Sequence, residues 1–365
     1  MPTPSTLVTP PTTQDDSTTM WALQYGGAHV TTWAEVPMAK IHDTTDVIVR
    51  VDMTTICGSD LHILKGDVPE VTVGRILGHE AVGTVHSVGS AVTTLKVGDR
   101  VIVSAITSCA TCIYCRQSRY GQCINGGGWI LGHLIDGTQA QYVRVPYAAT
   151  STTLVPKGVS DEELLMLADI LPTGYEIGVL NGQVKPGDVV AVVGAGPVGL
   201  SAIVTAKLLS PRVIIAIDLD DGRLARAKEF GADITINNST IDPLAQILAM
   251  TDDLGVDVAI EAVGVPASFD LATTLVRPCG RVANIGVHGA PVTLHMEKLW
   301  GHDVTITMGL VDTSSTPTLL SLVASRFLDV SHFATHHFTM SEFQEAYRVF
   351  ADAATSGALK VIITP

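Results

Sequence analysis

The sequence predicts an α/β protein with two domains, one rich in β-strands and one built on a doubly wound parallel sheet. The chain has 365 residues, a length that favours two domains over one. Short β-rich runs separated by Gly and Asp turns fill residues 21 to 156. After residue 188, apolar strands alternate with helical segments, which is the pattern of a parallel sheet with helices on both faces.

Periodicity places the individual elements. Strands are expected at 47 to 51, 97 to 103, 189 to 193, 213 to 217, 256 to 260 and 281 to 285, and helices at 200 to 209 and 222 to 230. Ser341 with Gln344 three residues later forms a capping-box pattern, which predicts a helix over 341 to 354. A closing strand is expected at 360 to 363.

Composition and charge exclude several classes of protein. Hydrophobic residues make up 46% and charged residues 16%, with 33 Gly and 18 Pro, so the chain is neither disordered nor a coiled coil. The 22 Lys and Arg against 36 Asp and Glu give a net charge of -14. A field of this sign repels nucleic acid and anionic membrane surfaces, so we expect neither as a partner.

The N-terminal segment shows no targeting signal. Residues 1 to 20 are rich in Thr and Pro and contain no Lys, Arg or long apolar run, which predicts a disordered tail on a cytoplasmic protein. Residues 189 to 206 carry no charge and have the length of a membrane-spanning helix. Their glycine-rich centre favours a buried strand, a sharp loop and a helix instead.

Four cysteines form a dense cluster in the first half. Cys109, Cys112, Cys115 and Cys123 are separated by two, two and seven residues. Four thiolates complete a tetrahedral zinc shell and leave no open position, so this site is predicted to be structural. A redox pair or disulfides are the alternative, which a reducing compartment disfavours.

A second metal site is predicted from two separate motifs. Cys57 opens CGSDLH, and His79 and Glu80 belong to GHE. A catalytic zinc needs three protein ligands and one exchangeable position, so another ligand must come from elsewhere in the chain.

The motif GAGPVG follows the apolar strand at 189 to 193 and precedes a predicted helix, the context in which a glycine-rich turn binds a pyrophosphate. The residues expected to contact a dinucleotide here are Gly194, Gly196, Pro197, Val198 and Gly199. Asp218 ends the next strand, where a carboxylate accepts hydrogen bonds from the adenosine ribose and repels a 2′-phosphate. This favours NAD over NADP. The alternative is that Asp218 only caps the next helix, a task that Asp220 or Asp221 performs equally well.

CGSDLH, GHE, the four-cysteine loop and GAGPVG with Asp218 occur in the order seen in zinc-dependent medium-chain alcohol dehydrogenases. From about residue 21 to residue 365 the chain resembles this family, and it looks closest to the bacterial secondary-alcohol branch. The resemblance implies a GroES-like catalytic domain over 21–172 and 311–365 and a Rossmann domain over 173–310.

The resemblance also implies site roles. Asp169 takes the place of the remaining zinc ligand beside Cys57 and His79, and Glu80 enters or leaves the coordination sphere. Ser59 takes the alcohol proton and His62 passes it toward solvent. Asp60 is expected to orient His79. Thr173 and Val198 are expected to line the nicotinamide, and Ile285 and Val287 to meet its carboxamide. Arg223 is expected to approach the adenosine ribose and Lys360 the pyrophosphate. Ser59 as a turn hydroxyl and His62 as a surface imidazole are the alternatives.

The predicted function is therefore reversible hydride transfer between a secondary alcohol and NAD, with one catalytic and one structural zinc per subunit. A polyol, threonine or formaldehyde dehydrogenase is the nearest alternative, and a non-catalytic protein that binds zinc and nucleotide is a remote one. Trp129 and Leu131 are expected in the pocket wall or in the core. An alternating run at 304 to 308 predicts an edge strand that pairs subunits, with a homotetramer favoured over a dimer.

Overall fold

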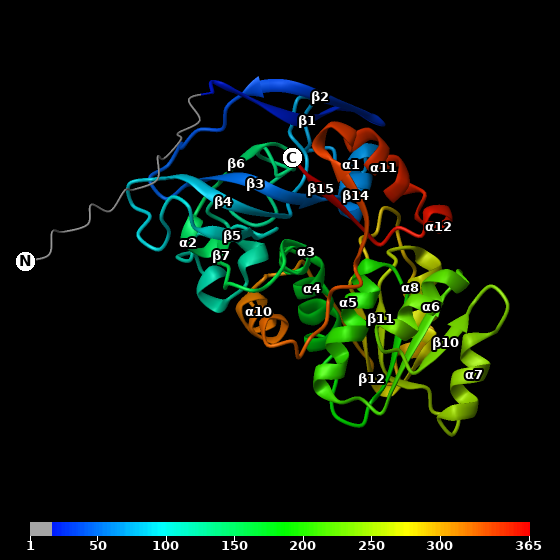
Figure 1. The fold of residues 1–365 in the computed structure, drawn as a ribbon. Coiled ribbons are helices and arrows are strands. Elements are labelled where there is room, and N and C mark those ends of the chain that lie inside the picture. The colour runs from blue at the N-terminus through cyan, green and yellow to red at the C-terminus, as the bar shows by residue number, and fades with distance from the viewer. Residues whose placement is uncertain (1–16) are drawn as a thin grey trace, which may run out of the picture.

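A computed structural model describes residues 17–365 of the chain. It is an α/β protein with a β-rich part and a parallel-sheet part (Figure 1). A disordered tail was expected at residues 1 to 20. Residues 1 to 16 of it lie outside the described part of the chain, and the expectation is wrong for its last two residues, which belong to a strand. Strand β1 (Thr19–Gly27) begins at Thr19 and pairs with β2 (Val30–Pro37), because Met20 opposite Val36 is buried in a small apolar core.

The β-rich part is a seven-stranded sheet with the order β14-β15-β3-β4-β5-β7, in which β6 also pairs with β3. The strands are β3 (Val47–Thr55), β4 (Ala81–Val88), β5 (Arg100–Val103), β6 (Tyr142–Val145), β7 (Thr152–Leu154), β14 (Ala334–Thr339) and β15 (Lys360–Thr364). Strand β15 pairs antiparallel with β3, so the last part of the chain returns to complete the first sheet (Figure 1).

The second sheet has six parallel strands in the order β10-β9-β8-β11-β12-β13. They are β8 (Val189–Val193), β9 (Val213–Asp218), β10 (Ile234–Asn237), β11 (Val256–Glu261), β12 (Val276–Asn284) and β13 (Thr305–Met308). All five residues of β8 are buried, as expected for a central strand covered on both faces. The strand order reverses between β8 and β11, and ligands bind at such a switch point in open α/β sheets.

Helices cover the second sheet and line the junction between the two sheets. Those of the parallel-sheet part are α5 (Pro197–Ala206), α6 (Asp221–Glu229), α7 (Pro243–Met250), α8 (Pro266–Leu275) and the short α9 (Met296–Leu299). The others are α1 (Gly58–Lys65), α2 (Ala148–Ser151), α3 (Asp161–Leu165), α4 (Ile170–Thr173), the π-helix η3 (Gly174–Leu180), α10 (Thr316–Ala324), α11 (Phe343–Ala351) and α12 (Ala353–Ser356). Single 3-10 turns are η1 (Cys115–Gln117), η2 (Tyr120–Gln122), η4 (Lys207–Leu209) and η5 (Met340–Glu342).

The helix expected over 341 to 354 is the main correction to the secondary structure. It is divided into η5, α11 and α12, and the capping box is formed by Thr339 and Glu342 rather than by Ser341 and Gln344. The Glu342 carboxylate accepts hydrogen bonds from the backbone N–H and the hydroxyl of Thr339, both at 2.8 Å. A carboxylate satisfies these donors better than an amide does, which places the cap at Thr339, two residues before Ser341.

One buried apolar cluster joins the two parts of the molecule. It contains Val82 and Ile102 of the first sheet together with Val190 and Ile260 of the second. Residues 189 to 206 are the strand β8, a loop and the helix α5, as expected. Among the described residues, no helix combines the length and the apolarity needed to cross a membrane.

Candidate active site

A cavity of about 300 Å³ lies where the two sheets meet. One side is formed by the start of α1 and by His79 and Asp169. The other side is formed by segments that follow β8, β11 and β12, which is the carboxyl edge of the parallel sheet. The predicted metal ligands and the predicted nicotinamide contacts therefore share one pocket.

Four potential metal ligands converge at one side of this pocket, and all of them except Glu80 line it. Cys57 precedes α1, His79 and Glu80 precede β4, and Asp169 precedes α4, and one donor atom from each lies within 4.8 Å of all the others. The Cys57 Sγ to Asp169 Oδ2 distance is 3.6 Å, and His79 Nε2 lies 3.4 Å from the same oxygen. Zinc bonds of about 2.0 to 2.3 Å in a tetrahedron give ligand-to-ligand distances of about 3.3 to 3.5 Å. The donors are spaced as the edges of a zinc site.

The protonation of this cluster also fits a bound cation. Burial and the nearby Asp169 carboxylate raise the pKa of the Cys57 thiol, and burial raises the pKa of Glu80. Burial opposes ionisation of Asp169 as well, but the hydrogen bond and the charge of His79 hold its pKa below the ordinary value. Several acidic groups are thus crowded into a space of low polarity, and a divalent cation relieves that crowding.

Asp60 lies behind His79, on the side away from the other ligands. Its Oδ1 is 3.8 Å from His79 Nδ1, and both atoms are buried without another partner. The second oxygen of Asp60 accepts hydrogen bonds from the Cys57 backbone N–H at 2.9 Å and from Gln139 Nε2 at 3.2 Å. Gln139 in turn accepts a hydrogen bond from the hydroxyl of Tyr347 at 2.9 Å. Asp60 is therefore held in a position that suits the orientation of a metal-binding imidazole.

Lys360 is placed differently from the expectation. The structure buries it, with Nζ 2.7 Å from Glu80 Oε1 and 3.2 Å from the carbonyl of Ile56, whereas a contact with the pyrophosphate was expected. A buried ammonium is stable only when it is paired, and Glu80 is the carboxylate in reach. The same pairing leaves Glu80 Oε1 4.0 Å from His79 Nε2, at the margin of the metal cluster.

The four-cysteine loop forms a second cluster between β5 and β6. All four sulfurs lie within 4.8 Å of one another, and Cys109 Sγ is 3.9 Å from Cys115 Sγ. Zinc–sulfur bonds of about 2.3 Å give tetrahedral edges of about 3.8 Å. Burial opposes ionisation of Cys109, but hydrogen bonds from Thr111 and Cys112 lower its pKa to about 6. All six cysteines are free thiols in the described residues, and the geometry suits zinc.

The cysteine loop is attached to the wall of the interdomain pocket. Asp312 Oδ1 accepts a hydrogen bond from the Gly121 backbone N–H at 2.9 Å, and Arg119 lies 3.5 Å from the other oxygen. Residues 309 to 311, which immediately precede Asp312, line the pocket. No motif in the sequence indicated this link, because its two halves lie about 190 residues apart.

The glycine-rich loop has the form needed to hold a pyrophosphate. Gly194 has a φ of 100°, and a Cβ on Gly199 would lie 1.9 Å from the carbonyl oxygen of Gly194, so α5 packs against the end of β8 without a side chain between them. A Cβ on Gly196 would meet nothing within 4 Å, so the approach to the helix N-terminus is open.

Asp218 stands beside this loop. Its Oδ2 accepts a hydrogen bond from the Ala195 backbone N–H at 2.7 Å, and Oδ1 accepts one from the Leu219 backbone N–H at 2.7 Å. The cap of α6 is Asp220, which binds the Arg223 backbone N–H at 2.8 Å. Asp218 is therefore not the helix cap.

Comparison with known proteins assigns the family. The family model of the alcohol dehydrogenase GroES-like domain matches residues 43–157, and that of the zinc-binding dehydrogenases matches residues 197–325. An alcohol dehydrogenase from Cupriavidus necator is 36% identical over 351 residues, covering 91% of this chain and 95% of that protein. The chain belongs to the zinc-binding alcohol dehydrogenase family.

Other relatives of this alcohol dehydrogenase agree in fold and vary in substrate. A sorbitol dehydrogenase from Bacillus subtilis is 32% identical, covering 89% of this chain and 91% of that protein. The solved zinc-dependent alcohol dehydrogenase 2 from Streptococcus pneumonia, in its apo form, has a TM-score of 0.91 and 47% identity. It covers 94% of this chain and 98% of its own. The chain is thus a zinc-dependent alcohol oxidoreductase with a GroES-like and a Rossmann-like part.

Several residues fall in the dehydrogenase pocket as expected. Thr173, Val198, Ile285 and Val287 line it, and the Thr173 hydroxyl donates to Asp169 at 2.7 Å. Trp129 also lines the pocket. Leu131 is fully buried in the core of the first sheet, which is the second of its two expected places. Arg223, expected near the adenosine ribose and not in this pocket, is half-buried on α6.

Two buried carboxylates were missed by the sequence analysis. Glu261 ends β11, and its Oε1 accepts hydrogen bonds from the backbone N–H groups of Val263 and Gly264 and from the Ser268 hydroxyl, at 2.6 to 2.9 Å. Glu176 lies on η3 and binds the turn at 312 to 315. Each fixes a segment of pocket wall from behind, and the only signal in the sequence is an acidic residue among apolar neighbours.

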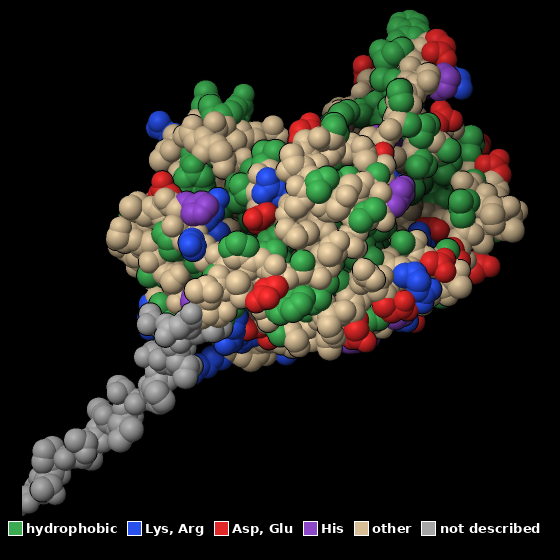
Figure 2. All heavy atoms as spheres, turned by 90° about the horizontal axis from the view of Figure 1, so that it is seen from above, with side chains coloured by type: hydrophobic (Ala, Val, Ile, Leu, Met, Phe, Trp, Pro, Cys, Tyr) green, Lys and Arg blue, Asp and Glu red, His purple; other side chains and the backbone are tan. Residues whose placement is uncertain are grey.

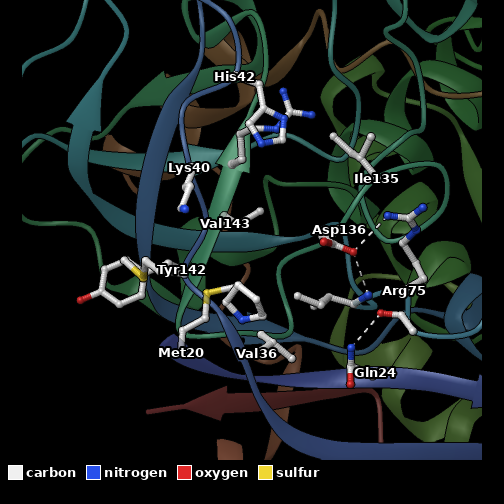
Figure 3. Close-up of a pocket in the computed structure, with 17 residues that line it drawn as sticks. Met20, Gln24, Val36, Lys40, His42, Arg75, Ile135, Asp136, Tyr142 and Val143 are labelled. Atoms are coloured by element: carbon white, nitrogen blue, oxygen red, sulfur yellow. Dashed lines mark hydrogen bonds and ion pairs between the residues drawn. The ribbon is translucent and has the colours of Figure 1, made fainter. Parts of the chain in front are cut away.

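A second cavity, larger than this pocket, contains none of the predicted site residues. A hollow of about 550 Å³ lies beside the β1–β2 hairpin, lined by Lys40, Arg75 and Asp136 and by apolar side chains (Figure 3). Arg75 is paired with Asp136 at 3.0 Å, and no predicted ligand or cofactor residue reaches this hollow. The face shown in Figure 2 carries acidic and basic side chains scattered among uncharged ones, without a continuous basic surface.

Proposed function

We propose that this dehydrogenase oxidises uncharged secondary alcohols to ketones with NAD and catalyses the reverse reduction. One observation carries the proposal: the ligand set Cys57, His79 and Asp169 opens onto a pocket whose far wall is apolar. Three protein ligands leave a fourth zinc position for a substrate oxygen.

The pocket wall favours a hydrophobic substrate. Apart from the metal ligands, its side chains include Val68, Ile106, Trp129, Leu310 and Val311, and no Lys or Arg lines it. A phosphate or carboxylate substrate finds no counter-charge here, and a polyol finds few hydrogen-bond partners for its further hydroxyls. Polyol, threonine and formaldehyde remain the alternatives that the assay below distinguishes.

The residues would form a catalytic metal site, a structural metal site and a cofactor site. Cys57, His79 and Asp169 would hold the catalytic zinc, and the four-cysteine loop the structural zinc. Zinc acidifies the substrate hydroxyl, and NAD accepts the hydride. Glu80, held by Lys360, would stay beside the metal as a reserve ligand.

Proton transfer falls to Ser59 and His62. Ser59 Oγ lies 3.5 Å from His79 Nε2, so it stands beside the position of the reacting oxygen. His62 lines the same pocket, one helical turn further along α1. We assign Ser59 as the acceptor of the alcohol proton and His62 as the next member of the relay.

Asp218 supports the choice of NAD. Its carboxylate lies at the end of β9, beside the glycine-rich loop, where ribose hydroxyls are bound and a 2′-phosphate is repelled. The remaining predicted contacts are Gly194, Gly196, Pro197, Val198 and Gly199 around the pyrophosphate and Arg223 near the adenosine ribose.

The assembly and the location of the enzyme are proposed on separate grounds. Strand β13 is the edge of the parallel sheet, and Trp300 and Met308 near it are 80% and 66% exposed. An uncovered strand edge with large apolar neighbours favours pairing with a second subunit, and we propose a homotetramer. Six free thiols suit a reducing compartment, which supports a cytoplasmic location.

Initial rates test the proposal. Zinc-loaded protein is assayed with secondary alcohols, primary alcohols, polyols, threonine and formaldehyde, each with NAD and with NADP. Secondary alcohols with NAD are expected to give the highest kcat/KM. Higher rates with a polyol, threonine or formaldehyde would refute the substrate, higher rates with NADP would refute the cofactor, and no turnover would refute the activity.

A further inference from the structure

Helix α1 ends in a turn that brings a carboxylate back onto its own last residues. Gly66 adopts the left-handed conformation, with φ 85° and ψ 14°, and its N–H donates to the Ile63 carbonyl at 3.0 Å. The Asp67 N–H donates to the His62 carbonyl at 3.0 Å. This pair of bonds is the Schellman motif, which reverses the chain at a helix C-terminus. Asp67 therefore lies beside His62, although five residues separate them.

The two side chains form a direct pair. His62 Nδ1 lies 2.8 Å from Asp67 Oδ2. An ionised carboxylate only accepts hydrogen bonds, so Nδ1 must carry the hydrogen and Nε2 is left with its lone pair. No hydrogen bond to His62 Nε2 is found among residues 17–365, so that nitrogen is available to accept a proton.

The pair bridges the pocket and the solvent. His62 lines the interdomain pocket and lies three residues after Ser59, on the same face of α1. The exposed fractions of the His62 and Asp67 side chains are 25% and 38%. Asp67 is thus on the outer side of His62, where an exchange of protons with water is open.

A segment of the nucleotide domain passes close to this pair. A Cβ on Gly289, in the segment after β12, would lie 3.4 Å from Asp67 Oδ2 and 3.9 Å from His62 Cε1. The same segment carries Ile285 and Val287 into the nicotinamide side of the pocket. The wall of the cofactor site and the His62–Asp67 pair are therefore separated by little more than the room for one methyl group.

We propose that Asp67 is a positioning residue for proton transfer: its carboxylate holds the His62 ring with Nε2 available to the relay and stabilises the imidazolium that forms. This inference rests on the proposed alcohol oxidation. The alcohol O–H bond breaks, its proton passes to Ser59 Oγ as the Ser59 proton passes through one intervening water to His62 Nε2, and the two electrons of the C–H bond leave with the hydride to NAD. The imidazolium then releases one proton to water at its exposed edge, and the neutral His62 imidazole beside the ionised Asp67 carboxylate is restored.

Asp67→Asn is the decisive variant. The amide keeps the shape of the side chain but loses the charge that orients and stabilises the ring. We expect kcat for alcohol oxidation to fall about ten-fold, while the KM for NAD stays within about two-fold. Asp67→Glu is expected to restore part of kcat. The matched control is Glu70→Gln, which removes an exposed carboxylate from the same loop and should leave kcat unchanged.

Two further readouts separate positioning from folding. Long-range proton–nitrogen NMR spectra of histidine-labelled protein should show hydrogen on Nδ1 of His62 in the wild type and a loss of that preference in Asp67→Asn. Added imidazole buffer should raise the kcat of the variant more than that of the wild type, because an external base replaces the missing relay. A role confined to folding would lower the melting temperature and change neither signal.

The outcomes distinguish this inference from the proposed function. A wild type that oxidises alcohols, with an Asp67→Asn variant whose kcat matches it, would overturn the role of Asp67 and leave the function intact. A mixed tautomer at His62 in the wild-type spectra would also overturn it. A wild type with no alcohol turnover would overturn the proposed function and the relay together.

Discussion

Glu176 provides the sharpest test of how the pocket wall is held. Its buried carboxylate accepts hydrogen bonds from the backbone N–H groups of Asp312, Thr313 and Ser315 and from the Ser315 hydroxyl, at 2.6 to 3.1 Å. The turn that it binds follows directly on the pocket residues 309 to 311. Glu176 therefore connects the helix between the two domains to the segment that returns to the first domain.

The substitution Glu176→Gln removes one of the two oxygens that accept these hydrogen bonds. A glutamine keeps one accepting oxygen and replaces the other with a donor, so two of the four donors lose their acceptor. At about 1 to 3 kcal/mol for each buried unsatisfied donor, the free energy of unfolding should fall by about 2 to 6 kcal/mol. At about 2.1 cal/mol/K of unfolding entropy per residue, this corresponds for a protein of this size to a decrease in Tm of about 3 to 8 °C.

Thermal unfolding and steady-state kinetics check the result. The loosened turn should also lower kcat/KM on the order of ten-fold, because residues 309 to 311 position the substrate. The control Glu229→Gln removes an exposed carboxylate whose partner is Arg226, and a surface pair of this kind should cost less than about 1 kcal/mol. A Tm of Glu176→Gln within about 2 °C of the wild type would refute the reasoning.

Three further predictions concern metal, cofactor and pH. Cys115→Ser should remove one of the two proposed zinc ions, as measured by atomic emission, and lower Tm; an unchanged zinc content would contradict the four-cysteine site. Asp218→Ser should raise kcat/KM with NADP relative to NAD on the order of ten-fold, and an unchanged ratio would place the adenosine ribose elsewhere. Burial opposes ionisation of Glu163, but Ser160 and Arg326 hold its pKa below the ordinary 4.5. The ionised Glu163 therefore stabilises the folded protein above pH 4.5, and this contribution is lost as the pH falls through the lowered pKa. Thermal unfolding at several pH values should therefore show Glu163→Gln less stable than the wild type by about 1 kcal/mol at neutral pH, with the gap closing in acid; a gap independent of pH would refute the ionised pairing.

The sequence was most informative where the chemistry is local. The sulfurs of Cys109 and Cys115 converge because they lie in one loop, and zinc chemistry restricts which residues such a loop contains. The strand β8 was predicted with its observed bounds, because an unbroken run of five apolar residues before a glycine turn is typical of a central parallel strand. Local periodicity and local spacing carried these predictions.

The rest depended on contacts between distant segments. Lys360 meets Glu80 across 280 residues of sequence, and a single lysine at a strand terminus carries no sign of burial. Glu176 binds backbone groups about 137 residues away, and backbone donors have no sequence signature at all. Leu131 was expected in the pocket or in the core, and its place in the core is determined by the packing of the first sheet. These placements follow from tertiary packing, which a single sequence does not encode in a readable pattern.

The return of the chain to the first sheet has a consequence for biosynthesis. The Thr55 hydroxyl of β3 binds the carbonyl of Val361 in β15, so two neighbours in the sheet are separated by 306 residues. The ribosome completes all strands of the dinucleotide domain, from β8 to β13, before β15 exists. The nucleotide-binding part is therefore able to fold during translation. The catalytic part is incomplete until β15 is made, and one edge of β3 is unpaired until then. During that interval Glu80 lacks Lys360, so its carboxylate has no cationic partner until the last strand is added.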